Sequence, residues 1–156
     1  MVREAELRVF EGNRDYWCQN NDFPLFYTLY EEDKQKHLIS RINKYLEKSS
    51  DQYILVGHSF GGIIAYSLSE NAYKRINKII TIASPHRVPF KWFKRIINKI
   101  PYKQSVNVEE QLSYGFLFDT TVPFIFTKHN SSKKHKNLLG EHNLILNNFE
   151  FITKIL

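Results

Sequence analysis

A serine that could act as a nucleophile lies in the segment Tyr53 to Gly62, which reads Tyr-Ile-Leu-Val-Gly-His-Ser-Phe-Gly-Gly. Strand-forming residues precede a Gly-x-Ser-x-Gly turn at 57–61, and the apolar stretch from Ile63 to Leu68 follows it. A strand, a tight turn and a helix in this order would lift the hydroxyl of Ser59 above the edge of a sheet, in a strained backbone conformation. Glycines at the ends of the turn avoid collisions with the strand and the helix. The segment therefore predicts a nucleophilic serine rather than an ordinary glycine-rich turn.

A serine nucleophile needs a base, and the best candidate is His142. It lies in the segment 140–144, Gly-Glu-His-Asn-Leu, directly before an amphipathic stretch at 143–156 that is predicted to be a helix. The alternative is an exposed histidine without a role. Other histidines lie inside the turn, in a predicted helix or in a lysine-rich stretch expected at the surface, and are weaker candidates: His58, His37, His129 and His135.

The run Gly-His-Ser-Phe-Gly-Gly-Ile-Ile-Ala-Tyr resembles the α/β-hydrolase superfamily, in particular its lipases, esterases and thioesterases. The resemblance is strong over residues 52–86 and again near His142. It implies that the serine comes first in the chain and the histidine last, in a loop after the final strand. It also implies an acidic residue in the loop after the preceding strand, which would orient the histidine.

Two positions compete for the acidic residue. If the preceding strand is Val122 to Thr127, the loop at 128–132 contains no carboxylate, and Asn130 is the nearest substitute. If Tyr114 to Phe118 is the strand, it delivers Asp119. We assign the acid to Asp119, with an Asn130-assisted pair, a serine–histidine dyad or another carboxylate as alternatives. Asp119 could also be an ordinary turn residue, since aspartate favours turns.

The oxyanion of the reaction would need two N–H donors. The resemblance implies the N–H of Phe60, the residue after the serine, and a second donor in the loop after an early strand. Residues 7–17 look like a degraded form of that strand and loop, with Gly12 or Asn13 as the second donor. A plain surface turn is the alternative for this segment.

A candidate lid lies between the serine and the histidine, at 87–113. On a helix from 88 to 100, apolar and basic side chains would occupy opposite sides. The apolar side consists of Trp92, Phe93, Ile96, Ile97 and Ile100, and the basic side of Lys91, Lys94, Arg95 and Lys99. Such a helix can cover an apolar pocket or touch an anionic membrane, with Trp92, Phe93 and Ile96 binding the substrate. Packing of this face on the core is the alternative.

The chain of 156 residues is expected to form a single α/β domain, 1–156, without a separate cap. Predicted helices at 32–48, 63–68 and 143–156 alternate with predicted strands at 53–56, 78–83 and 122–127. This order implies a mainly parallel sheet of about five or six strands with helices on both faces, a minimal α/β-hydrolase fold. The site then belongs at the carboxyl ends of the strands.

Composition limits the classes of function. An apolar content of 42% favours a packed globule over disorder, and a lone cysteine excludes an internal disulfide framework. The absence of a leader or a long apolar run predicts a cytoplasmic protein. The net charge of +6 comes without a nucleic-acid-binding motif, so no nucleic-acid partner is expected. The reaction expected here needs neither a metal nor a cofactor.

The sequence therefore predicts a serine hydrolase of the lipase or carboxylesterase type that cleaves a small-molecule or lipid acyl ester through an acyl-enzyme on Ser59. An acyl thioesterase is the nearest alternative. A catalytically inactive hydrolase fold that serves in binding is the alternative from another class. The sequence leaves the acyl chain length and the oligomeric state open.

Overall fold

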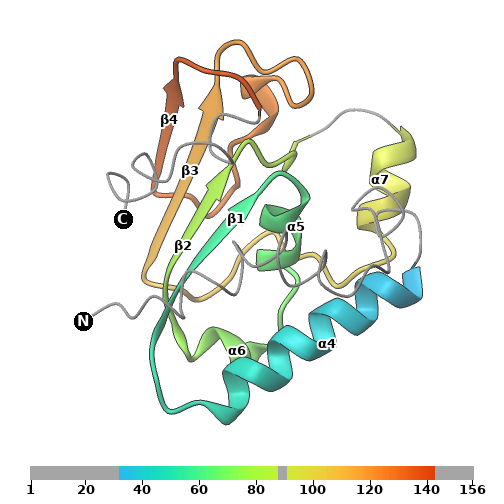
Figure 1. The fold of residues 1–156 in the computed structure, drawn as a ribbon, viewed down its shortest axis with the longest axis vertical. Helices are drawn as coiled ribbons and strands as arrows, with labels where there is room; N and C mark the ends of the chain where they lie inside the picture. The colour runs from blue at the N-terminus through green and yellow to red at the C-terminus, as the bar shows by residue number, and fades with distance from the viewer. Residues whose placement is uncertain (1–31, 88–90, 143–156) are drawn as a thin grey trace, which may run out of the picture.

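A computed structural model describes residues 32–87 and 91–142 of the chain, with the exception of four side chains within its helices, those of Lys34, Trp92, Phe93 and Ile96. The predictions for Gly12, Asn13, the early strand and the C-terminal helix lie outside these residues. At the centre is a parallel sheet of four strands, whose spatial order β1-β2-β3-β4 follows their order in the chain (Figure 1). The strands are β1 (Tyr53–His58), β2 (Ile76–Ile82), β3 (Glu110–Phe116) and β4 (Lys134–Leu138).

Helices connect the strands and cover one face of the sheet. The helical elements are α4 (Glu32–Lys48), α5 (Phe60–Ala65), α6 (Glu70–Tyr73), α7 (Lys91–Ile97) and the short 3₁₀ helix η1 (Phe124–Phe126). In Figure 1, α5 lies against β1, while α4 and α6 run together along the lower end of the molecule. Within the described ranges, no helix is both long enough and apolar enough to span a membrane. The fold class is therefore α/β with a parallel sheet, as the alternation of elements predicts.

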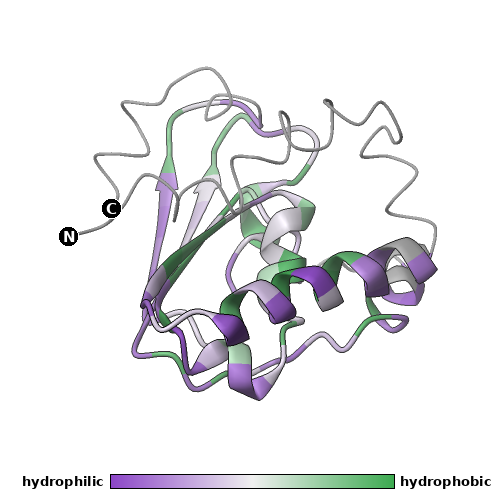
Figure 2. Ribbon diagram, turned by 60° about the horizontal axis from the view of Figure 1, so that its bottom comes forward, coloured by the Kyte–Doolittle hydropathy of each residue, from purple (hydrophilic) through white to green (hydrophobic). Residues whose placement is uncertain are grey.

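The two faces of the sheet carry separate apolar clusters, which explains the near-continuous apolar runs in β1 and β2. Leu55 and Ile79 pack with Ile63 of α5 and Leu46 of α4 on the helix-covered face. The opposite face holds a second cluster with Ile80, Ile82 and Phe116 at its centre, all fully buried. The helices predicted for that face are not among the described elements. Figure 2 shows the apolar residues concentrated along β1, β2 and the inner sides of the helices.

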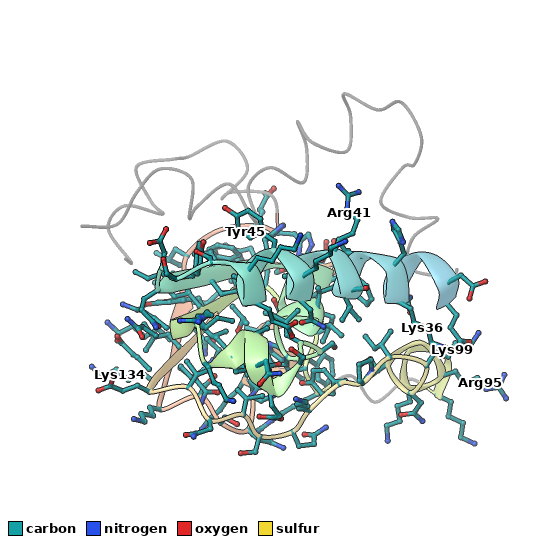
Figure 3. All side chains as sticks on the ribbon, turned by 90° about the horizontal axis from the view of Figure 1, so that it is seen from below. Lys36, Arg41, Tyr45, Arg95, Lys99 and Lys134 are labelled. Atoms are coloured by element: carbon teal, nitrogen blue, oxygen red, sulfur yellow. The ribbon has the colours of Figure 1, made fainter. Side chains whose placement is uncertain are left out.

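The amphipathic helix α4 has the bounds that the sequence predicts, because its apolar positions recur at helical spacing. Acidic residues occupy its first turn and Lys48 its last, which suits the helix dipole. Glu32 lies 2.7 Å from the Lys36 ammonium and 4.0 Å from that of Lys99, so a charge network joins α4 to the segment after α7 (Figure 3). These pairs are exposed to solvent, so they contribute little to the stability of the fold.

The strand predicted at 122–127 in the C-terminal half is wrong. Residues 122–127 form no strand, because Pro123 cannot donate to a ladder and a short 3₁₀ helix follows it. The strand comes later, as β4, whose sequence Lys-His-Lys-Asn-Leu lacks an apolar alternation. Its side chains are mostly half-buried or exposed, so the hydrogen bonds to β3, not apolar burial, define this strand.

Buried histidine and tyrosine side chains pack together near the end of β2. His129, predicted to be at the surface, is buried and stacks on Tyr66 with ring centroids 3.4 Å apart. Its Nε2–H donates to the Lys103 carbonyl at 3.1 Å, and its Nδ1 accepts from the Ser131 N–H. His86 is also buried, with its ring nitrogens 3.1 Å from the Thr81 hydroxyl and 3.0 Å from that of Tyr102. Both rings are held neutral because burial penalises a charge there.

The burial of these two histidines predicts that the fold becomes less stable in acid. Burial lowers the pKa of His129 to about 4, and burial together with the neighbouring His129 lowers the pKa of His86 well below 6.5. In the unfolded chain both groups protonate near pH 6.5, so their stabilising contribution is complete above that pH and is lost as pH falls toward 4. The free energy of unfolding should drop by up to about 1.4 kcal/mol per pH unit for each of these histidines. Urea unfolding at a series of pH values measures this, and His129→Phe should make the slope shallower. A pH-independent midpoint between neutral and mildly acidic solution would contradict the prediction.

Candidate active site

Parallel strands bring distant parts of the chain to one edge of the sheet. Ser59 directly follows β1, Asp119 lies shortly after β3, and His142 lies shortly after β4. These three strands and β2 are held in register by continuous pairing, so their carboxyl ends lie on the same side. The sequence predictions for the three residues therefore converge at the edge where α/β proteins place their sites.

The three side chains form a hydrogen-bonded chain. His142 Nε2 lies 3.0 Å from Ser59 Oγ, and His142 Nδ1 lies 2.7 Å from Asp119 Oδ2. Because a carboxylate can only accept, Nδ1 carries the proton and Nε2 is free to accept the proton of the serine hydroxyl. The arrangement is that of a nucleophile, a base and an orienting acid.

The backbone at Ser59 is strained in the way that the turn motif predicts. Ser59 has φ 53° and ψ −124°, a conformation that residues with a side chain rarely adopt. Its N–H donates to the Ile82 carbonyl at 2.9 Å, which ties the turn to β2. The hydroxyl makes no capping bond to α5. The strain thus directs the hydroxyl toward His142 instead of back into the helix.

Glycines make this turn possible by letting the helix approach the strand. A Cβ at Gly57 would lie 2.7 Å from backbone atoms of both Gly61 and Gly62. A Cβ at Gly62 would lie 2.1 Å from the Ser84 hydroxyl. The sequence predicts close contacts at both ends of the turn, Gly57 and Gly61; the structure has the contact at Gly57, and the second close contact lies at Gly62, the other glycine of the doubled pair.

Asp119 has two structural partners besides His142. Its side chain is fully buried, and its Oδ1 accepts hydrogen bonds from the N–H groups of Thr121 at 2.9 Å and Val122 at 2.7 Å. It is therefore both a turn residue and the partner of the histidine, two interpretations that the sequence presented as alternatives. Asn130 instead contacts Arg87 and Gln104, so its amide is occupied elsewhere.

His58, which the sequence suggested was only the variable residue of the turn, also reaches His142. Its Nε2 lies 2.7 Å from the His142 carbonyl oxygen, and the two imidazole centroids are 4.9 Å apart. Burial lowers the pKa of His58 to about 4, against a smaller raising effect of its hydrogen bond to His142. The ring therefore stays neutral near pH 7.

The predicted oxyanion donors are only partly described. Phe60 is the first residue of α5, where backbone N–H groups have no partner inside the helix. Gly12 and Asn13 lie outside the described residues, so the second donor stays a prediction. No group of three or more metal-ligating side chains occurs within 32–87 and 91–142.

The candidate lid is described only in part. Helix α7 covers Lys91–Ile97, and the last residues of the proposed range, 110–113, belong to β3 and hence to the sheet. Two apolar residues of the predicted face lie against the core: Ile100 is buried and Ile97 is partly buried. The side chains of Trp92, Phe93 and Ile96 lie outside the described set, so their role as a lid stays a prediction.

Exposed apolar side chains gather beside the predicted acid and base. Leu117 and Phe118 directly precede Asp119 and are 42% and 65% exposed, and Leu139, just past β4, is 72% exposed. Hydrogen bonds from Leu117 N to the Leu138 carbonyl and from Phe118 N to the Gly140 carbonyl place these segments side by side. We call Leu117, Phe118 and Leu139 the apolar rim.

Comparisons with known proteins agree with this architecture. The chain has the α/β-hydrolase fold: the mouse alpha/beta hydrolase domain-containing protein 10 superimposes with a TM-score of 0.50 at 14% identity, covering 80% of this chain and 70% of that one. A family model described as the PGAP1-like alpha/beta domain matches residues 17–139. The chain belongs to this family, which supports a hydrolase. No curated protein sequence matches the chain significantly.

The double role of Asp119 predicts different costs for two substitutions. Asp119→Ala removes the acceptor of two backbone N–H groups and should lower the free energy of unfolding by about 1–3 kcal/mol. Asp119→Asn keeps an oxygen at the Oδ1 position and should cost clearly less. Urea unfolding of both variants measures the difference. Equal stabilities for the two variants would show that the turn does not depend on an acceptor oxygen at the Oδ1 position.

Proposed function

We propose that the protein is a serine hydrolase that cleaves carboxylic esters through an acyl-enzyme on Ser59. The observation that carries this proposal is the chain of hydrogen bonds from Ser59 Oγ through His142 to the buried Asp119 carboxylate. Ser59 alone would be a weak nucleophile, since its hydroxyl is protonated at neutral pH. A base within 3.0 Å, itself oriented by a carboxylate, is what activates such a hydroxyl.

In the proposed reaction, Ser59 Oγ attacks the ester carbonyl carbon while its proton moves to His142 Nε2. The carbonyl oxygen becomes an oxyanion, and the N–H of Phe60 is the proposed donor to it. Asp119 stabilises the imidazolium that forms on His142 without taking its proton. His142 then protonates the leaving alcohol, and the acyl group stays on Ser59. Water, activated by the same imidazole, releases the acid and restores the serine.

The apolar rim supports an ester with an apolar acyl part. Exposed apolar side chains that lie next to a hydrogen-bonded serine, histidine and aspartate offer a surface on which an apolar ligand can bind. Phe118 and Leu139 lie on two neighbouring segments, one after β3 and one after β4, that are joined by backbone hydrogen bonds. An acyl chain bound along them would lie next to the reacting carbonyl. Lipid acyl esters and smaller apolar esters both fit this description.

The nucleophile is tested by labelling with a fluorophosphonate probe. The wild-type protein should be labelled, and Ser59→Ala should not be, with ester hydrolysis lower by about 10³-fold or more. Ser59→Ala should keep its melting temperature, because the hydroxyl caps no helix. Parallel assays on p-nitrophenyl esters and acyl-CoA separate an esterase from a thioesterase. A folded wild-type protein that resists the probe and hydrolyses neither substrate would favour a binding role.

The rim is tested by the dependence on acyl chain length. Phe118→Ser should lower kcat/KM for a long-chain p-nitrophenyl ester by about tenfold, because an apolar contact of one group is worth this much, and should leave the acetate ester nearly unchanged. Tyr45→Ser provides the control, since Tyr45 is a half-exposed aromatic residue on α4, remote in sequence from the rim. Equal losses for both esters in Phe118→Ser would show that the rim does not bind the acyl chain.

A further inference from the structure

Two neighbouring residues hold opposite ends of His142. The hydroxyl of Ser59 contacts the ring of His142, and the ring of His58 contacts its backbone carbonyl oxygen at 2.7 Å. A carbonyl oxygen only accepts, so the Nε2 of His58 must carry the proton and donate it. His58 is itself fixed, because it is the last residue of β1 and pairs in register with Ile82. The imidazole of His58 therefore connects the end of β1 to the backbone of His142.

The loop that carries His142, residues 139–142 in the described part of the chain, has few other hydrogen bonds to its backbone. β4 ends at Leu138, and Gly140 then takes φ 152°, a conformation that favours glycine. The Gly140 carbonyl accepts from the Phe118 N–H at 3.1 Å. The hydrogen bond from His58 fixes the backbone in the same way at His142. Without it, the Phe118–Gly140 hydrogen bond alone would fix the backbone next to the base.

We propose that His58 is a positioning residue, which fixes the backbone of His142 so that Nε2 stays within reach of Ser59 Oγ. This inference rests on the proposed function, because it concerns the geometry of the same base. The neutral state of the ring matters as well: His142 becomes positively charged during the proposed reaction, and a second cation 4.9 Å away would oppose that charge. Burial keeps the imidazole of His58 neutral and so allows it to serve as a donor without this penalty.

Three substitutions separate the hydrogen bond from the bulk of the side chain. His58→Gln places an amide donor at about the reach of Nε2, while His58→Met has a similar length and no donor. His58→Asn donates as well, but its amide ends closer to the backbone. The matched control is His135→Met. The ring of His135 contacts Ser113 of β3 and Asn137 of β4.

The expected kinetic result is a loss of kcat without a matching change in KM. His58→Met and His58→Asn should lower kcat by about 10- to 100-fold, because a displacement of about 1 Å in a reacting group costs this much. His58→Gln should restore most of the rate, and His135→Met should leave it unchanged. Equal rates in His58→Met and wild type would overturn the proposal, as would equal losses in the Gln and Met variants at unchanged melting temperature.

A second readout needs no substrate. The proton between His142 Nδ1 and Asp119 Oδ2, in a bond of 2.7 Å, should give a far-downfield proton resonance in the NMR spectrum of the wild-type protein. The resonance should persist in His58→Gln and broaden or disappear in the Met and Asn variants. If it persists unchanged in the latter two, His58 does not position His142. The two hypotheses can fail separately: absent labelling at Ser59 contradicts the proposed function, while an unchanged resonance contradicts only the positioning role. Should His58→Met fail to fold, His58→Asn decides by the same measurements.

Discussion

The buried carboxylate of Asp119 is the group on which the geometry of the site depends. Its two oxygens act in different directions: Oδ1 holds the N–H groups of Thr121 and Val122, and Oδ2 holds the imidazole of His142. A carboxylate without exposure to water is stable only if such bonds replace its hydration. The turn that follows β3 therefore cannot relax without releasing the histidine. Local structure and the proposed chemistry share one side chain.

The strain at Ser59 is supported by the sheet in a comparable way. A left-handed φ at a residue with a side chain costs of the order of 1–3 kcal/mol and persists only where the surroundings fix it. Here the surroundings are β2, which accepts the Ser59 N–H, and the glycine contact between Gly57 and the first turn of α5. Because β1 and β2 carry buried apolar residues on both faces, this support lies in the core of the described fold. The rigid strands thus bear the strain of the turn.

The sequence predicted the elements whose signals are local. The turn motif between apolar stretches identified β1 and α5, and helical spacing defined α4 to the residue. It failed at β4, because a strand with four polar or charged residues in succession has no apolar signature and forms only when β3 offers its backbone. That error produced the competition between Asp119 and Asn130. In the structure the last strand is β4, and the strand before it is β3. The loop that follows β3 contains Asp119.

His58 escaped the sequence analysis for a related reason. Inside a Gly-x-Ser-x-Gly turn its position tolerates many residue types, and its partner, a carbonyl 84 residues away in the chain, leaves no mark in the sequence. In the structure, burial lowers the pKa values of His58, His86 and His129, and each of these rings contacts neutral partners. His142 differs from all three, because its ring is bonded to a carboxylate. A positive charge is therefore penalised on the three buried rings, whereas the ring that contacts the serine is the one of these four that is hydrogen-bonded to a carboxylate. This contrast arises from position alone, since the four side chains are chemically identical.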